Sequence, residues 1–128
     1  MEVHDPGRVL AAAPALIITE RTTGAEVSAS YCGFGRLDDY EIGGRRFRGR
    51  TPWERHPLRD ELLFVSDGEA ELTLLFPDRE ERIVLRKGAL CVVSRGTWHR
   101  FDAAGVASIW GVTHGADDEM SEADDPRL

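Results

Sequence analysis

Short apolar runs separated by turn residues limit most strongly what this chain can fold into. The clearest runs are ELLFVS from Glu61, EAELTLLF from Glu69, RIVLR from Arg82, ALCVVS from Ala89 and GVASIWGVT from Gly105. No long helical period and no internal repeat accompanies them. This pattern predicts an all-β protein with roughly eight to ten short strands and at most one short helix, built as a jelly roll or a small barrel.

Turn signals and weaker runs predict the connections. Asp67-Gly68 is the strongest short hairpin signal, and Gly43-Gly44 predicts a second tight hairpin between YEI and RRFR. The segment GFGRLDD from Gly33 is rich in Gly and Asp, which predicts a connection. We expect early strands at ALII from Ala15 and at EVSAS from Glu26.

Length and composition indicate one ordinary globular domain. The chain has 128 residues, of which 41% are hydrophobic and 30% charged. No apolar run approaches the roughly 18 to 20 residues that span a bilayer. Acidic residues near the start argue against a secretory signal, so we expect a cytoplasmic protein without a membrane partner. Cys32 and Cys91 belong to no CxxC pair and are expected to be reduced thiols.

The net charge of −7 is unevenly distributed. Residues 115–128 hold six acids and a single base, Arg127, which predicts a loosely draped, solvated tail. An acidic chain without a basic stripe is a poor nucleic-acid binder. One basic cluster could hold a small anion; it comprises Arg45, Arg46, Arg48, Arg50 and Arg55.

Four side chains from separate runs are potential metal ligands. Side chains alternate along a strand, so Glu54 and His56 share a face if their segment is extended. Glu61 opens the next run, and His99 lies on a later one. If these runs are neighbouring strands, the four donors can converge at a barrel mouth, as a metal site requires. Taken singly, each histidine could instead be a hydrogen-bonded core residue.

The spacing of these residues resembles the two motifs of the cupins. Residues 49–68 read G-x4-E-x-H-x4-E-x6-G, beside the cupin pattern G-x5-H-x-H-x3-4-E-x6-G. Residues 88–103 read G-x5-S-x-G-x2-H-x3-A, beside G-x5-P-x-G-x2-H-x3-N. The resemblance implies a cupin jelly-roll barrel over residues 1–114, followed by the acidic tail 115–128. It also implies a homodimer.

The resemblance also implies a set of metal ligands. It places them at His56, Glu61 and His99, with Glu54 where the family has its first histidine. Glu54 could be a fourth ligand, a residue that orients a histidine, or a general base. Such a site would hold one divalent transition metal, with iron, manganese, zinc and nickel left open.

Other residues are candidates for a substrate pocket. Phe101 shares the face of His99, and Trp110 could line the same space. If the strand before Trp53 runs on without a bulge, Arg48 and Arg50 could clamp a substrate carboxylate. Tyr31 could move protons if it faces the pocket.

Two functions of different classes follow from these observations. The first is a metal-dependent enzyme of oxygenase, isomerase or lyase type, acting on a small organic molecule. The alternative is a non-catalytic module that binds or senses a small ligand. A crowded apolar barrel would favour the binding module. A purely structural role is weakest, since it would bury the polar ligands without purpose.

Overall fold

A computed structural model describes residues 1–115 and 118–128 of the chain. This part of the chain contains ten strands and two short helices, which confirms the all-β class and the expected number of strands but exceeds the one helix expected at most. Neither helix has the length and apolar character needed to cross a membrane. The helices are α1 (Pro6–Ala12) and α2 (Gly24–Ser30). The strands are β1 (Leu16–Ile17), β2 (Cys32–Leu37), β3 (Tyr40–Arg50), β4 (Trp53–Arg55), β5 (Glu61–Asp67), β6 (Glu69–Leu75), β7 (Glu80–Arg86), β8 (Leu90–Val93), β9 (Trp98–Thr113) and β10 (Glu119–Ser121).

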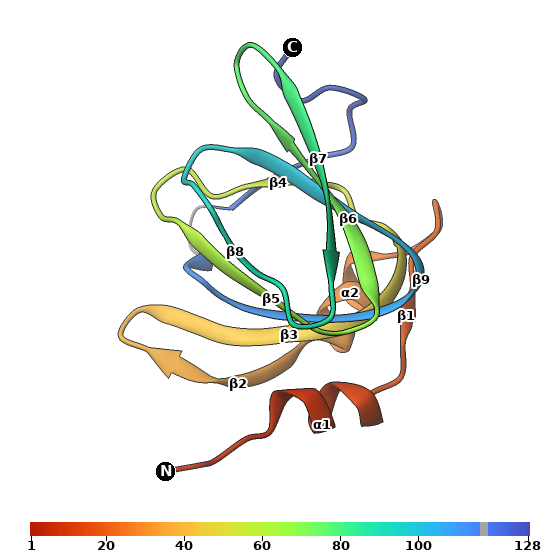
Figure 1. Ribbon diagram of the computed structural model, residues 1–128, viewed down its shortest axis with the longest axis vertical. Helices are drawn as coiled ribbons and strands as arrows, with labels where there is room; N and C mark the ends of the chain where they lie inside the picture. The colour runs from red at the N-terminus through yellow and green to blue at the C-terminus, as the bar shows by residue number, and fades with distance from the viewer. Residues whose placement is uncertain (116–117) are drawn as a thin grey trace.

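The long strand β9 organises the fold. Its first residues pair with β4 and β6, and its later residues pair with β3 and β5. The sheet thereby curls over on itself as a jelly roll, with β9 running through both halves (Figure 1). The inward side chains form one apolar core, which includes Phe47, Leu63, Val65, Leu72, Val93 and Ile109.

The Asp67-Gly68 pair makes a corner, so the predicted hairpin is wrong. β5 and β6 do not pair with each other, because both run antiparallel to β9, one after the other. Gly68 has φ +70°, and a Cβ there would lie 2.4 Å from the carbonyl oxygen of Val106. Glycine therefore serves the sharp bend and the close backbone contact between the two halves of the sheet.

The predicted hairpin at Gly43-Gly44 is also wrong. β3 runs straight through both glycines, and the turn lies earlier, between Leu37 and Tyr40. GFGRLDD mostly belongs to β2, against the expectation of a connection. The two glycines answer a packing need, since a Cβ on Gly44 would lie 2.1 Å from the carbonyl oxygen of Ile109.

The segment EVSAS lies in helix α2, so the expected strand is wrong. Thr23 caps the helix, and its side chain and that of Glu26 bond to each other's backbone N–H groups. This capping box is a T-x-x-E pattern that outweighs the β-branched Val27. Of the expected ALII strand, only Leu16 and Ile17 pair, in parallel with β3.

The acidic tail is more ordered than expected. β10 pairs antiparallel with β4, and the indole N–H of Trp53 donates to the carbonyl oxygen of Asp124 (3.3 Å). Arg127 donates to the carbonyl oxygens of Phe76 and Arg79. The tail therefore covers the free edge of β4, the strand that carries Glu54.

Candidate metal centre

Four side chains from three strands meet at one end of the barrel interior. Glu54 lies on β4, His56 just after it, Glu61 at the start of β5 and His99 on β9. Their donor atoms all lie within 4.8 Å of one another. His56, Glu61 and His99 are only 4%, 7% and 2% exposed. The structure thus brings together the four residues that the sequence singled out.

Backbone pairing fixes the positions of these side chains. Glu54 is the direct cross-strand partner of His99, and Glu61 is that of Val93. The loop after β4 is tied to the turn before β9, because the N–H of Gly96 donates to the carbonyl oxygen of His56 (2.9 Å). The site is therefore built on the sheet with its donors already in place.

The Nδ1 atoms of both histidines face outward from the cluster. Nδ1 of His56 lies 2.6 Å from the Asp118 carboxylate, and Nδ1 of His99 lies 3.0 Å from the carbonyl oxygen of Thr97. Both partners only accept, so each Nδ1 carries a hydrogen and donates it. When either ring is neutral, its Nε2 lone pair therefore points into the cluster, the arrangement typical of histidine ligands to metals.

The two carboxylates make the cluster strongly attractive to positive charge. Glu54 and Glu61 oxygens lie 2.7 and 3.1 Å from Nε2 of His56, and Glu61 also lies 3.1 Å from Nε2 of His99. Burial alone would lower the pKa of His56, but Glu54 and Glu61 outweigh it and raise this pKa to about 11. Burial alone would raise the pKa of Glu61, and the two imidazoles instead hold it well below its usual range.

The geometry fits a bound cation. Nε2 of His56 and Oε1 of Glu61 are buried, and neither has a well-aligned hydrogen-bond partner among the described residues. Their contacts with the neighbouring ligand atoms are close but poorly aligned, and a shared cation would satisfy them better. Donors sharing one ion at roughly 2.0 to 2.2 Å lie at most about 4.4 Å apart. A contraction of a few tenths of an ångström would therefore let all four reach one metal.

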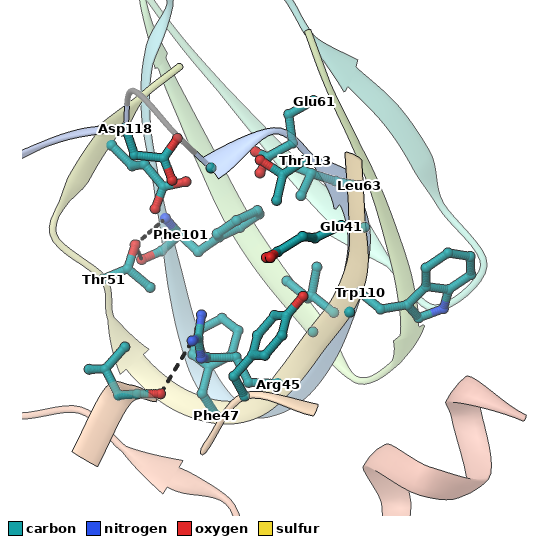
Figure 2. A pocket seen from close by; sticks show the side chains of 18 of the residues that line it. Glu41, Arg45, Phe47, Thr51, Glu61, Leu63, Phe101, Trp110, Thr113 and Asp118 are labelled. Carbon is teal, nitrogen blue, oxygen red and sulfur yellow. Dashed lines mark hydrogen bonds between the residues drawn. The ribbon is translucent and has the colours of Figure 1, made fainter. Parts of the chain in front are cut away.

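A cavity of about 470 Å³ opens beside the cluster. Glu54, Glu61 and His99 contribute to its wall. Its apolar walls come from Phe47, Leu63, Phe101 and Ile109. Figure 2 looks into this space, with Glu61 and Arg45 at opposite sides of the view. Its size suits a small organic ligand.

The residues predicted to line a pocket fall in different places. Phe101 and Tyr31 line the cavity. Trp110 also borders it, but its indole points away and packs against Phe64 at 5.3 Å between ring centroids (Figure 2). Arg48 and Arg50 are exposed and are not among the lining residues, so the clamp expected of them is not found there. A register shift between Phe47 and Gly49 breaks the strand continuity on which that clamp depended.

Two residues of the site were not predicted from the sequence. Asp118 comes from the acidic tail, where nothing local distinguishes it from five neighbouring acids of the same segment. Arg45 lines the cavity, while the sequence offered it only as one member of a basic cluster. Strand parity could have found Arg45, because it shares a β3 face with the core residue Phe47.

The fold and the site together define a jelly-roll protein with a histidine–carboxylate cluster suited to a metal. Residues 48–110 match the family model of the cupin domain. The chain belongs to the cupin family, as its two motifs indicated. None of the curated proteins searched matches it.

Solved structures agree with this assignment. A cupin-2 domain containing protein from Shewanella frigidimarina is 25% identical, with a TM-score of 0.56, over 66% of this chain and 78% of that one. Protein NMB1881 from Neisseria meningitidis is 18% identical, with a TM-score of 0.66, over 87% and 97% of the two chains. Hydroquinone 1,2-dioxygenase PnpCD, solved with Cd2+ and 4-hydroxybenzonitrile, is 23% identical, with a TM-score of 0.55, over 62% and 60%. At the lower identities the likeness is one of fold alone.

Proposed function

We propose that this cupin is an enzyme that binds one divalent transition metal and acts on a small organic molecule. Its metal ligands would be His56, Glu61, His99 and Glu54. The observation that carries the proposal is the convergence of these four donors, three of them buried, beside a cavity whose wall includes Glu54, Glu61 and His99. The negative charges of Glu54 and Glu61 balance the two positive charges of a divalent ion, so the carboxylates and the ion together would be neutral.

The donor set narrows the choice of metal. Two imidazoles with two carboxylates are harder ligands than a three-histidine set, which favours iron(II), manganese or zinc over softer ions. Nickel is the fourth of the metals that the sequence left open. A bound ion of this kind would polarise substrate oxygens and stabilise negative charge that develops on them.

The protein's own residues would orient the substrate and handle protons. Phe47 and Phe101 would hold an apolar group, since both rings border the cavity, 6.3 Å apart between centroids. Tyr31 would keep its proton at neutral pH, because burial, and then the charge of Glu41, raises the pKa of its hydroxyl, and it could hold that proton toward the substrate in the cavity that it lines.

The cavity supports an enzyme rather than a non-catalytic binding module. A crowded barrel interior would favour the module, whereas here an open space of about 470 Å³ reaches Glu54, Glu61 and His99. A substrate in that space would lie directly against the metal ligands.

Metal content tests the proposed centre. Tag-free protein would be loaded separately with Fe2+ (without oxygen), Mn2+, Zn2+ and Ni2+, desalted and analysed by mass spectrometry. We expect close to one equivalent of at least one metal, and less than a tenth in His99→Ala. His114→Ala is the matched control, because His114 pairs with Asp39 outside the cluster. Equal metal content in the two variants would refute the proposal.

Turnover separates the enzyme from the binding module. Metal-loaded protein would be incubated with a library of small organic acids, phenols and hydroxy ketones, and substrate loss followed by mass spectrometry. We expect loss that disappears in His99→Ala. Ligands that bind but are all recovered unchanged would instead support the binding module.

We also propose that the protein is a cytoplasmic homodimer. The outer face of β5, β8 and β9 carries adjacent apolar side chains, and Leu90 and Val92 are 58% and 57% exposed. A second copy could cover this face. Light scattering after size exclusion should give twice 14.2 kDa, and a mass near 14.2 kDa would contradict the dimer.

A further inference from the structure

Arg45 is a cation fixed in the cavity wall away from the metal ligands. It lies on β3, half-buried, and lines the same cavity as Glu61 and His99. Its Nε–H donates to the hydroxyl of Ser30 (3.1 Å), and an Nη2–H donates to the carbonyl oxygen of Val27 (3.2 Å). Both acceptors belong to the last turn of α2. The helix end therefore holds the guanidinium in one orientation.

The guanidinium has donors left over. A guanidinium carries five N–H groups, and the two bonds to α2 use two of them, which leaves three. Within residues 1–115 and 118–128, no carboxylate lies within 4.0 Å of Arg45. A partly buried cation without an ionic partner is unusual, because such charges are normally paired.

The part of the cavity wall next to Arg45 is aromatic. The guanidinium carbon lies 5.4 Å from the centre of the Tyr31 ring, and Phe47 and Phe101 form the adjoining wall. Burial lowers the pKa of Arg45 while the charge of Glu54 opposes that shift, and the group remains a cation at neutral pH. Four acids also border the cavity: Glu54 and Glu61 of the metal cluster, Asp118 beside His56, and Glu41, whose carboxylate lies 3.6 Å from Arg36.

We propose that Arg45 is the anchoring residue for a substrate carboxylate. The substrate class would be a small monocarboxylic acid with an aromatic or branched apolar body. Its carboxylate would accept hydrogen bonds from Arg45, and its body would lie against Phe47 and Phe101. A second oxygen, as a hydroxyl, keto or phenol group, would then face the metal ligands. This inference rests on the proposed function, because it deepens the description of the same cavity.

Matched pairs of acids and amides test the charge requirement directly. Zn2+-loaded full-length protein would be titrated with benzoate, phenylacetate and 3-phenylpropionate, and with the three corresponding amides, by calorimetry. We expect at least one acid to bind ten times or more tightly than its amide. The same preference should persist in metal-free protein, which separates binding at Arg45 from binding at the metal.

Two variants assign the effect to Arg45. Arg45→Gln should reduce binding of the preferred acid at least tenfold and leave binding of the amide within twofold. Arg46→Gln is the matched control, because Arg46 also tethers an N-terminal segment, through the carbonyl oxygen of Ala13 (3.0 Å), but does not line the cavity. Arg45→Lys keeps the charge and should retain part of the preference.

The outcomes distinguish this inference from the proposed function. Zinc content of each sample is measured alongside the titration. Normal zinc with equal binding of acids and amides, with no binding of any acid, or with unchanged acid binding in Arg45→Gln, would overturn the role of Arg45 alone. Should Arg45→Gln fail to fold, the acid–amide comparison on the wild-type protein decides by itself. Loss of zinc binding in the wild-type protein would instead count against the metal centre.

Discussion

At the scale of single residues, Glu54 is where this chain departs from the family pattern. Its oxygen lies 2.7 Å from Nε2 of His56 and within the four-donor cluster, although its side chain is 33% exposed. These contacts favour a metal ligand over a distant general base. The sequence predicted which residues would converge. It left the role of Glu54 open, because a glutamate can act either as a metal ligand or as a general base.

Replacing Glu54 should weaken metal binding. Glu54→Gln removes a charge but keeps the shape, so we expect the affinity for Zn2+ to fall on the order of 10- to 100-fold. Competition with a chromogenic chelator measures the change. Glu41→Gln is the control, since Glu41 borders the cavity outside the cluster. An unchanged affinity in Glu54→Gln would mean that Glu54 is no ligand.

Asp118 should act by orienting His56. Its carboxylate accepts from Nδ1 of His56 (2.6 Å), so Asp118→Asn is expected to lower Zn2+ affinity roughly 10- to 100-fold. The control is Asp124→Asn, because only the backbone carbonyl of Asp124 is used, by Trp53. The same chelator competition applies, and equal affinities in the two variants would contradict the orienting role.

Metal binding should release protons. The pKa of His56 is raised to about 11 in the metal-free site, so this imidazole is protonated at neutral pH. Only the neutral ring can bind a metal, so the metal-bound state holds fewer protons and the affinity for Zn2+ rises with pH. Calorimetry near neutral pH in two buffers of different ionisation enthalpy should show about one proton released. Binding without proton release would argue that His56 is not a ligand.

At the scale of secondary-structure elements, local residues determine some segments, and pairing between distant strands determines others. The turns before β7 and β9 carry the turn residues Asp78 and Gly96, which decide the backbone locally. The hairpin at Gly43-Gly44 was predicted wrongly, because both glycines serve close packing. A Cβ on Gly43 would lie 2.2 Å from the hydroxyl oxygen of Tyr31, and a Cβ on Gly44 would lie 2.1 Å from the carbonyl oxygen of Ile109 on β9. The order of the tail was not predicted, because amino-acid composition carries no information about the free edge of β4 that β10 covers.

The capping box of α2 should be worth a measurable share of stability. Thr23→Ala removes the acceptor for the Glu26 N–H, and we expect a loss of about 1 kcal/mol in the free energy of unfolding. Urea denaturation measures it. Ser28→Ala, an exposed position on the same helix, should change stability by less than about 0.5 kcal/mol. Equal effects would mean that the cap contributes nothing.

At the scale of the whole molecule, the sheet depends on the corner at Gly68. The two motifs predicted the family and its fold, since they carry the ligands and the glycines at fixed spacing. They did not predict that β5 and β6 form successive parts of one bent path along β9. That path is set by contacts between distant segments, which short-range patterns do not encode.

Gly68→Ala should destabilise the whole fold. The residue has φ +70°, and an added Cβ would lie 2.4 Å from the carbonyl oxygen of Val106, so strain and a backbone clash add together. We expect a loss of about 3 kcal/mol or more in urea denaturation. Gly88→Ala is the control, with φ +89° but open space around the Cβ, and should cost only about 1 kcal/mol. A smaller effect at Gly68 than at Gly88 would contradict the corner.

The proposed metal would be held between β4, β5 and β9. Anomalous diffraction from a metal-loaded crystal, recorded on both sides of the absorption edge of that metal, would locate it. We expect one peak about 2.0 to 2.3 Å from Nε2 of His56, Nε2 of His99 and an oxygen of Glu61. A loaded crystal with no peak among these atoms, or with its peak elsewhere, would contradict it.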